Sequence, residues 1–134
     1  MNFLESMRPV TIDYDGTLTR KDVQEFVGHL VTAKVKVFII TSRYDELHKH
    51  LYPGMVTSQE VFILAGKLGI PISRVIFTNM ESKGIYLKNT NVIMHLDDDE
   101  SHLQELIDEG CKTVGINVKS NTWLEQAYHV MKRF

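Results

Sequence analysis

The stretch VTIDYDGTLT, residues 10–19, joins a short β-branched run to two acids, a glycine and two further threonines. The run predicts a strand, and Asp13 and Asp15 stand two residues apart at its end, directly before Gly16. Carboxylates that are held close together raise the cost of each other's ionisation. A chain that needs only a turn can use one Asp-Gly or Asn-Gly pair. The two acids therefore indicate either a bound cation or a proton-transfer task.

Outward from this stretch, strands and helices alternate along the chain. Apolar runs rich in β-branched residues predict five strands, at 8–15, 35–43, 74–79, 91–97 and 112–118. Apolar residues at helical spacing predict helices between them, at 22–34, 57–70, 99–110 and 121–134, with short helical segments at 45–52 and 82–89. Asp22 is the expected N-cap of the first helix, and Thr57 or Ser58 that of the next long one. The alternation predicts an α/β fold, a Rossmann-like three-layer α/β/α sandwich with a mainly parallel five-stranded sheet.

The composition limits the classes of protein that fit. The chain has 134 residues, a net charge of −2 and a single cysteine, Cys111. This length suits one domain, and the near-neutral charge gives no reason to expect a membrane or nucleic-acid partner, although it leaves nucleic acid open. One cysteine rules out an internal disulfide, and no signal-peptide or membrane-spanning pattern is visible in the sequence. We therefore expect a cytoplasmic protein with one domain, residues 1–134.

Polar residues follow four of the predicted strands at the point where each strand ends. They are Asp13 and Asp15, then Thr41, Ser42 and Arg43, then Thr78 and Asn79, and finally Asp97, Asp98 and Asp99. In a parallel sheet these ends share one edge, where ligands bind. The facing carboxylates would repel one another strongly unless a cation neutralised them. Oxygen ligands of this kind suit Mg²⁺, which commonly also binds substrate phosphate.

These residues resemble the four motifs of the haloacid dehalogenase-like (HAD) phosphohydrolases. The stretch DYDGTLT is similar to the DxDGT motif that opens that family's site, and Thr41 ends the next strand as the second motif does. Lys83 matches the basic residue of the third motif, and the acids of HLDDDE match the fourth. The motifs occur in order over about residues 10–100. The resemblance implies a Mg²⁺-dependent phosphatase that hydrolyses a phosphomonoester.

The resemblance also implies a role for each matching residue. Asp13 would attack phosphorus to form an aspartyl phosphate. Asp15 would donate a proton to the leaving group and then activate water. Thr41 would hydrogen-bond the phosphoryl oxygens, and Lys83 would neutralise the phosphoryl group, with Lys88 as the rival lysine for that role.

The implied cofactor is Mg²⁺, and the implied ligands are again at the strand ends. Asp13, Asp97 and the backbone carbonyl of Asp15 would bind the metal, and Asp98 would support them. Backbone N–H groups around Gly16, together with Thr41, Ser42 and Arg43, are the candidates for substrate binding. The alternative for Arg43 is that it forms only a surface ion pair.

Many members of that family carry a cap domain, but neither interval between the motifs here has room for one. We therefore expect a HAD-like core without a cap and with an open crevice. Such a crevice accepts a bulky substrate or borrows a lid from another subunit, so an oligomer is left open. Both a nucleic-acid end and a small metabolite remain candidate substrates.

Two functions compete with the phosphatase. The first is a phosphoryl-binding or regulatory HAD-like module with little turnover. The second is a receiver-like domain, which the order of the acidic motifs disfavours. The six histidines show no spacing that indicates a metal site, and His95, within a predicted strand, is expected to be packed.

Overall fold

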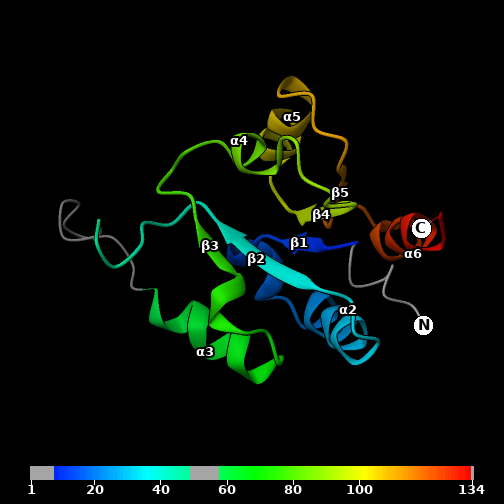
Figure 1. Ribbon diagram of the computed structural model, residues 1–134. Coiled ribbons are helices and arrows are strands. Elements are labelled where there is room, and N and C mark those ends of the chain that lie inside the picture. The colour runs from blue at the N-terminus through cyan, green and yellow to red at the C-terminus, as the bar shows by residue number, and fades with distance from the viewer. Residues whose placement is uncertain (1–7, 49–57, 134) are drawn as a thin grey trace.

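The structure is a computed structural model that describes residues 8–48 and 58–133. A sheet of five parallel strands in the order β3-β2-β1-β4-β5 forms its centre (Figure 1). The strands are β1 (Val10–Ile12), β2 (Val37–Thr41), β3 (Val75–Phe77), β4 (Met94–Asp97) and β5 (Val114–Asn117). The predicted parallel five-stranded sheet is confirmed, and each strand is shorter than its predicted range.

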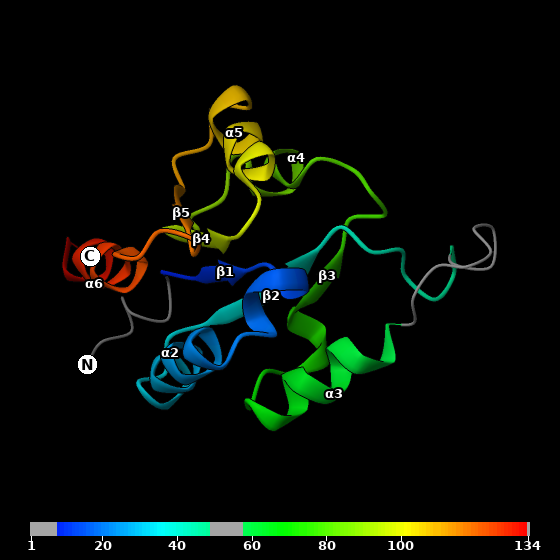
Figure 2. The same cartoon turned by 180° about the vertical axis from the view of Figure 1, so that it is seen from behind.

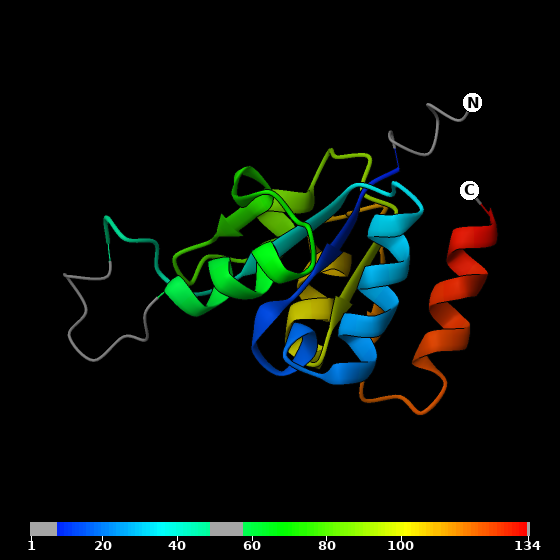
Figure 3. The same ribbon diagram turned by 90° about the horizontal axis from the view of Figure 1, so that it is seen from below.

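Helices cover both faces of the sheet. The described helices are α2 (Lys21–Thr32), α3 (Gln59–Lys67), α4 (Lys83–Leu87), α5 (Glu100–Asp108) and α6 (Trp123–Arg133). Two short segments, η1 (Tyr14–Leu18) and η3 (Ile72–Arg74), follow β1 and precede β3. Helices α4 and α5 lie on one side of the sheet, as Figure 1 and the reverse view in Figure 2 show. Helices α2, α3 and α6 lie on the other side (Figure 3), so the predicted three-layer arrangement is confirmed.

Alternation along the strands divides the core into two unequal parts. Ile12 belongs to the larger apolar cluster, which includes residues of α2, α3 and α6. Ile40 belongs to a smaller cluster with residues of α4 and α5. The second cluster is smaller because buried polar residues occupy the same face at the middle of the sheet, namely Thr11, His95 and Asp97. The candidate site lies at the end of this polar strip.

The start of α2 differs from the prediction. The helix begins at Lys21, so Arg20 and not Asp22 occupies the N-cap position. The prediction for Asp22 is wrong because its carboxylate lies in the first turn of the helix. There it accepts a hydrogen bond from Arg20 Nη2 at 2.6 Å and one from the backbone N–H of Val23 at 2.9 Å. An acid in this turn still favours the helix through its dipole.

Helix α3 begins directly after Ser58, as predicted. The Ser58 hydroxyl donates to Glu46 and does not cap the helix, whereas Thr57 lies outside the described residues. The helix ends shortly before Gly69, whose φ of +78° suits the turn that closes a helix.

The predicted helical segment 45–52 is described only in part. Residues 46–48 form a turn in which Asp45 accepts the backbone N–H groups of Leu47 and His48. The remainder lies within 49–57, outside the described residues. The expectation of a core without a cap therefore stays a prediction.

Candidate active site

The chain turns sharply out of β1 immediately after Asp13. The Asp13 backbone N–H donates to the Leu96 carbonyl of β4 at 2.9 Å, and its own carbonyl accepts the Leu18 N–H at 3.0 Å. Gly16 within this turn has a φ of +75°, and a Cβ there would lie 2.3 Å from Asp98 Oδ2. The turn therefore requires glycine both for its backbone angle and for its close approach to Asp98.

Lys83 connects the two acidic strand ends. Its Nζ lies 2.6 Å from Asp13 Oδ1 and 2.8 Å from Asp97 Oδ2, and the residue is only 1 % exposed. It reaches them as the first residue of α4. The rival Lys88 has a half-exposed side chain that lies 3.9 Å from Glu109. Of the two candidate lysines, the structure brings Lys83 to the carboxylates.

Thr17 lies between Asp13 and Asp98. Its hydroxyl oxygen is 3.1 Å from Asp13 Oδ2 and 3.2 Å from Asp98 Oδ1. A hydroxyl carries a single hydrogen, so it satisfies only one of these carboxylate oxygens at a time. The space between the two aspartates therefore keeps surplus acceptor capacity. The sequence pattern did not indicate this contact of Thr17, although the residue belongs to the stretch VTIDYDGTLT.

The carboxylate of Asp97 is more fully occupied. Its Oδ2 receives both Lys83 Nζ and His95 Nε2, each at 2.8 Å. His102 Nδ1 lies 3.5 Å from the same oxygen and has no hydrogen-bond partner among the described residues. Ligand atoms of Asp13, Asp97 and His102 lie within 4.8 Å of one another. Spacing along the sequence did not reveal either histidine, because the fold alone brings them to Asp97.

Burial controls the protonation of this cluster. It raises the pKa of Asp13 to about 7, with the lowering charge of Lys83 partly cancelled by the charge of Asp97. Burial would also raise the pKa of Asp97, but the two neighbouring histidines and Lys83 hold it below its usual range. The two carboxylates raise the pKa of Lys83 in spite of its burial, so this side chain stays an ammonium.

The donor set fits a hard divalent cation. Lys83 Nζ contacts both Asp13 and Asp97, and the pKa of Asp13 is raised first by burial and then by the charge of Asp97, in spite of this ammonium. Asp97 is engaged by Lys83, whereas Asp13 Oδ2 and Asp98 Oδ1 share only the hydrogen of Thr17. Asp13 and Asp98 therefore keep acceptor capacity for a cation. Asp97 holds Lys83, and the metal roles that the resemblance implied for Asp97 and Asp98 stay predictions.

Asp15, the second aspartate of the motif, pairs with Arg43 at the surface. Arg43 donates from Nε to Asp15 Oδ2 at 2.9 Å and from Nη2 to Oδ1 at 2.7 Å. The same Nη2 lies 2.6 Å from Glu60 Oε1 of α3, and the guanidinium carbon lies 4.9 Å from the centre of the Tyr14 ring. These partners leave the Arg43 side chain 9 % exposed and that of Asp15 55 % exposed. The structure shows the ion pair that was one of the two possibilities for Arg43, and contact with a substrate stays a prediction.

Thr41 and Ser42 shape the loop that follows β2. Thr41 is fully buried, and its hydroxyl accepts the backbone N–H of Arg43 at 3.3 Å. The Ser42 carbonyl accepts the N–H of Met80 at 2.8 Å. Both residues thereby order the segment that carries the guanidinium. Their contact with a phosphoryl group stays a prediction.

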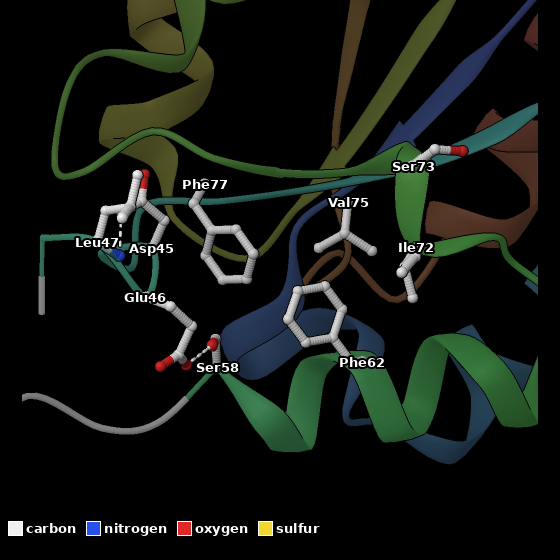
Figure 4. Close-up of a pocket in the computed structure, with 9 residues that line it drawn as sticks. All are labelled: Asp45, Glu46, Leu47, Ser58, Phe62, Ile72, Ser73, Val75 and Phe77. Carbon is white, nitrogen blue, oxygen red and sulfur yellow. Dashed lines mark hydrogen bonds between the residues drawn. The ribbon is translucent and has the colours of Figure 1, made fainter.

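An apolar groove of about 540 Å³ lies between β3 and α3, at the edge of the sheet. Phe62 of α3 points toward Val75 and Phe77 of β3 (Figure 4), and the two phenylalanine rings pack edge to face at 5.6 Å. Glu46 and Ser58 lie at one end of it. The residues that line the groove include none of the predicted site residues, so it is separate from the carboxylate cluster.

No protein-family model and no curated protein matches the sequence. A function must therefore be inferred from the chemistry of the site. Within residues 8–48 and 58–133, the helices lack the combination of length and apolar composition that crossing a membrane requires.

Proposed function

We propose that this protein is a Mg²⁺-dependent HAD-like phosphohydrolase that cleaves a phosphomonoester through an aspartyl phosphate on Asp13. The observation that carries the proposal is the buried contact of Lys83 Nζ with both Asp13 and Asp97. Burying charges in this way costs solvation, and apolar residues of similar volume are often as stable or more so. Charged clusters at the carboxyl ends of parallel strands are typical of functional sites.

Asp13 is the proposed nucleophile. One of its oxygens accepts a hydrogen bond from Lys83 Nζ, and the other accepts one from the Thr17 hydroxyl. Attack of the carboxylate on phosphorus forms the acyl phosphate bond and breaks the ester P–O bond. The Lys83 ammonium, held by Asp97, neutralises charge that develops on the phosphoryl oxygens.

Mg²⁺ would be held by Asp13, Asp98 and the backbone carbonyl of Asp15. When bound, this ion screens the repulsion between the carboxylate nucleophile and the phosphoryl group. Attack requires the anionic form of Asp13, and a pKa of about 7 leaves a share of the protein protonated at neutral pH. A bound cation would favour the anionic form of Asp13, because the cation binds the carboxylate and competes with the proton.

Asp15 is the proposed general acid and base. Protonated Asp15 gives its proton to the leaving oxygen. The resulting carboxylate then takes a proton from the water that attacks the aspartyl phosphate, which releases phosphate and restores Asp13. The ion pair with Arg43 must open before Asp15 can donate a proton. A substrate phosphate is a suitable new partner for the guanidinium, because two phosphate oxygens can accept the same pair of N–H groups that now bind the Asp15 carboxylate.

A phosphoryl-binding module with little turnover is the second candidate, and the ion pair of Asp15 favours it. An acid held by Arg43 as a carboxylate does not protonate leaving groups. Phosphorylation of Asp13 would then be slow, and the acyl phosphate would persist. The two candidates differ in whether phosphate is released with repeated turnover.

The test measures hydrolysis of p-nitrophenyl phosphate with Mg²⁺, with EDTA and in Asp13→Asn. We expect activity with Mg²⁺ that EDTA and the substitution each abolish. Asp99→Asn is the matched control, because Asp99 caps α5 through Ser101 and asparagine caps equally well. Full activity in metal-stripped protein or in Asp13→Asn would contradict the proposal. Stable phosphorylation without turnover would favour the second candidate.

A further inference from the structure

His95 lies at the centre of the sheet and is fully buried. It stands directly opposite Thr11 in the pairing of β1 with β4. Its Nδ1 lies 2.8 Å from Thr11 Oγ1, and its Nε2 lies 2.8 Å from Asp97 Oδ2. Because Asp97 also contacts Lys83, a line of hydrogen bonds runs from the middle of the sheet to Asp13.

The neighbours of His95 fix the positions of its protons. A carboxylate oxygen accepts hydrogen bonds, so His95 Nε2 donates to Asp97 Oδ2. In a neutral imidazole one ring nitrogen donates and the other accepts, so Nδ1 is then the acceptor that faces Thr11 Oγ1. Thr11 must then donate its hydroxyl hydrogen to Nδ1. The hydrogen-bond partners therefore specify the Nε2–H tautomer.

One oxygen of Asp97 serves two donors, and this makes its orientation critical. Oδ2 receives His95 from the sheet and Lys83 from α4. Without the donor of His95, the carboxylate loses one of the two contacts that fix this oxygen. Lys83 would then lose the defined position that places its ammonium 2.6 Å from Asp13.

We propose that His95 is a positioning residue for phosphoryl transfer. It orients the Asp97 carboxylate, which in turn holds the Lys83 ammonium against Asp13. The proposal rests on the proposed function, in which Lys83 neutralises the phosphoryl group. In metal sites, removing a residue that orients a ligand through a hydrogen bond typically costs about 10–100-fold in metal affinity or activity. We expect a similar cost here.

A purely packing role for His95 makes a different prediction. If the ring only fills space, activity should follow the volume of the replacement and the stability of the variant. If the ring positions Asp97, activity should depend on whether the replacement offers a hydrogen-bond donor where His95 Nε2 now lies. Glutamine can place an amide N–H near that point, whereas asparagine reaches only the place of Nδ1.

The test compares His95→Gln with His95→Asn, with kcat and KM for p-nitrophenyl phosphate determined separately and thermal unfolding measured alongside. We expect His95→Asn to lower kcat by about 10–100-fold with little change in KM. His95→Gln should recover most of that loss. Thr11→Val should lower kcat less, and Thr11→Ser should restore it. Thr113→Val is the matched control, because it removes a buried hydroxyl that bonds the Val92 carbonyl outside this line.

A second readout does not depend on turnover. Nitrogen-15 NMR should show His95 with a protonated Nε2 and a bare Nδ1. The Lys83 ammonium should give a slowly exchanging signal that His95→Asn weakens and His95→Gln restores. An Nδ1–H tautomer, or equal kcat values for the two His95 variants, would overturn the proposal. A wild type without phosphatase activity would refute the proposed function, whereas the NMR result alone decides whether His95 positions Asp97 and Lys83.

Discussion

Lys83 Nζ lies 2.6 Å from Asp13 Oδ1, although 70 positions separate the two residues along the chain. The fold creates this contact by placing the start of α4 at the carboxyl ends of β1 and β4. Both side chains are buried, so the contact differs from the screened surface pairs that contribute little to stability. The contact should therefore affect both the stability of the protein and its turnover.

Lys83→Met should abolish turnover and destabilise the protein. It leaves two buried carboxylates without their cation, which typically costs about 3–5 kcal/mol. The loss should be larger at pH 8 than at pH 5, because Asp13 with a pKa of about 7 takes up a proton at the lower pH. Urea unfolding at both pH values measures it. Lys88→Met, at a half-exposed lysine, should change stability by no more than about 1 kcal/mol, and equal losses in the two variants would contradict the assignment of Lys83.

Mg²⁺ should stabilise the protein more at pH 8 than at pH 5.5. Folding raises the pKa of Asp13 from 3.8 to about 7, so the stability it contributes is fully present below 3.8 and is lost as the pH rises through 7. Above pH 7 the cation meets a free carboxylate, whereas below it a proton competes for the same oxygens. The increase in melting temperature on adding Mg²⁺ measures this, and Asp13→Asn should remove its pH dependence. A pH-independent increase would count against Asp13 as a ligand.

Gly16→Ala should destabilise the protein by about 1–3 kcal/mol and weaken Mg²⁺ binding. The new Cβ meets both an unfavourable φ of +75° and Asp98 Oδ2 at 2.3 Å. Gly28→Ala is the control, because Gly28 lies within α2 and its Cβ would meet no atom within 4 Å. It should stabilise the protein by about 0.5–1 kcal/mol. Calorimetry and a Mg²⁺ titration of both variants test the pair, and an unaffected Gly16→Ala would show that the turn tolerates a side chain.

Asp15→Asn should slow turnover by about 10²–10⁴-fold for a poor leaving group. A good leaving group such as p-nitrophenolate needs less help from an acid, so Asp15→Asn should lower the rate on p-nitrophenyl phosphate by a smaller factor. Steady-state rates on p-nitrophenyl phosphate and an alkyl phosphate provide the comparison. Equal losses on both substrates would remove Asp15 from the role of general acid.

The sheet and its acidic rim could be predicted from the sequence because each depends on a local pattern. Five apolar runs alternate with segments whose apolar residues have helical spacing, and this alternation predicts the α/β layers. Parallel strands then bring their carboxyl ends to one edge of the sheet. Gly16 between Asp15 and Thr17 indicated the turn that carries the first two acids. The choice of Lys83 over Lys88 required the structure, since both residues stand in the same short helical segment.

The partners of the acids could not be predicted, because they come from distant parts of the chain. Thr11 and His95 stand 84 positions apart and meet only through the register of β1 and β4. Asp97 and Asp98 are identical neighbours in the sequence, yet one ends a strand and faces Lys83 while the other reaches Thr17. No local pattern distinguishes them, because the distinction lies in which residue is the last of the strand.

Reduction of the phosphorylated protein with borohydride tests the central claim most directly, namely that Asp13 carries the phosphoryl group. Borohydride converts an acyl phosphate to an alcohol, so mass spectrometry of peptides from protein quenched during turnover identifies the residue that was phosphorylated. We predict homoserine at the position of Asp13, formed only when both substrate and Mg²⁺ are present. An unmodified Asp13 during active turnover, or reduction at Asp15 or Asp98, would contradict the proposed mechanism.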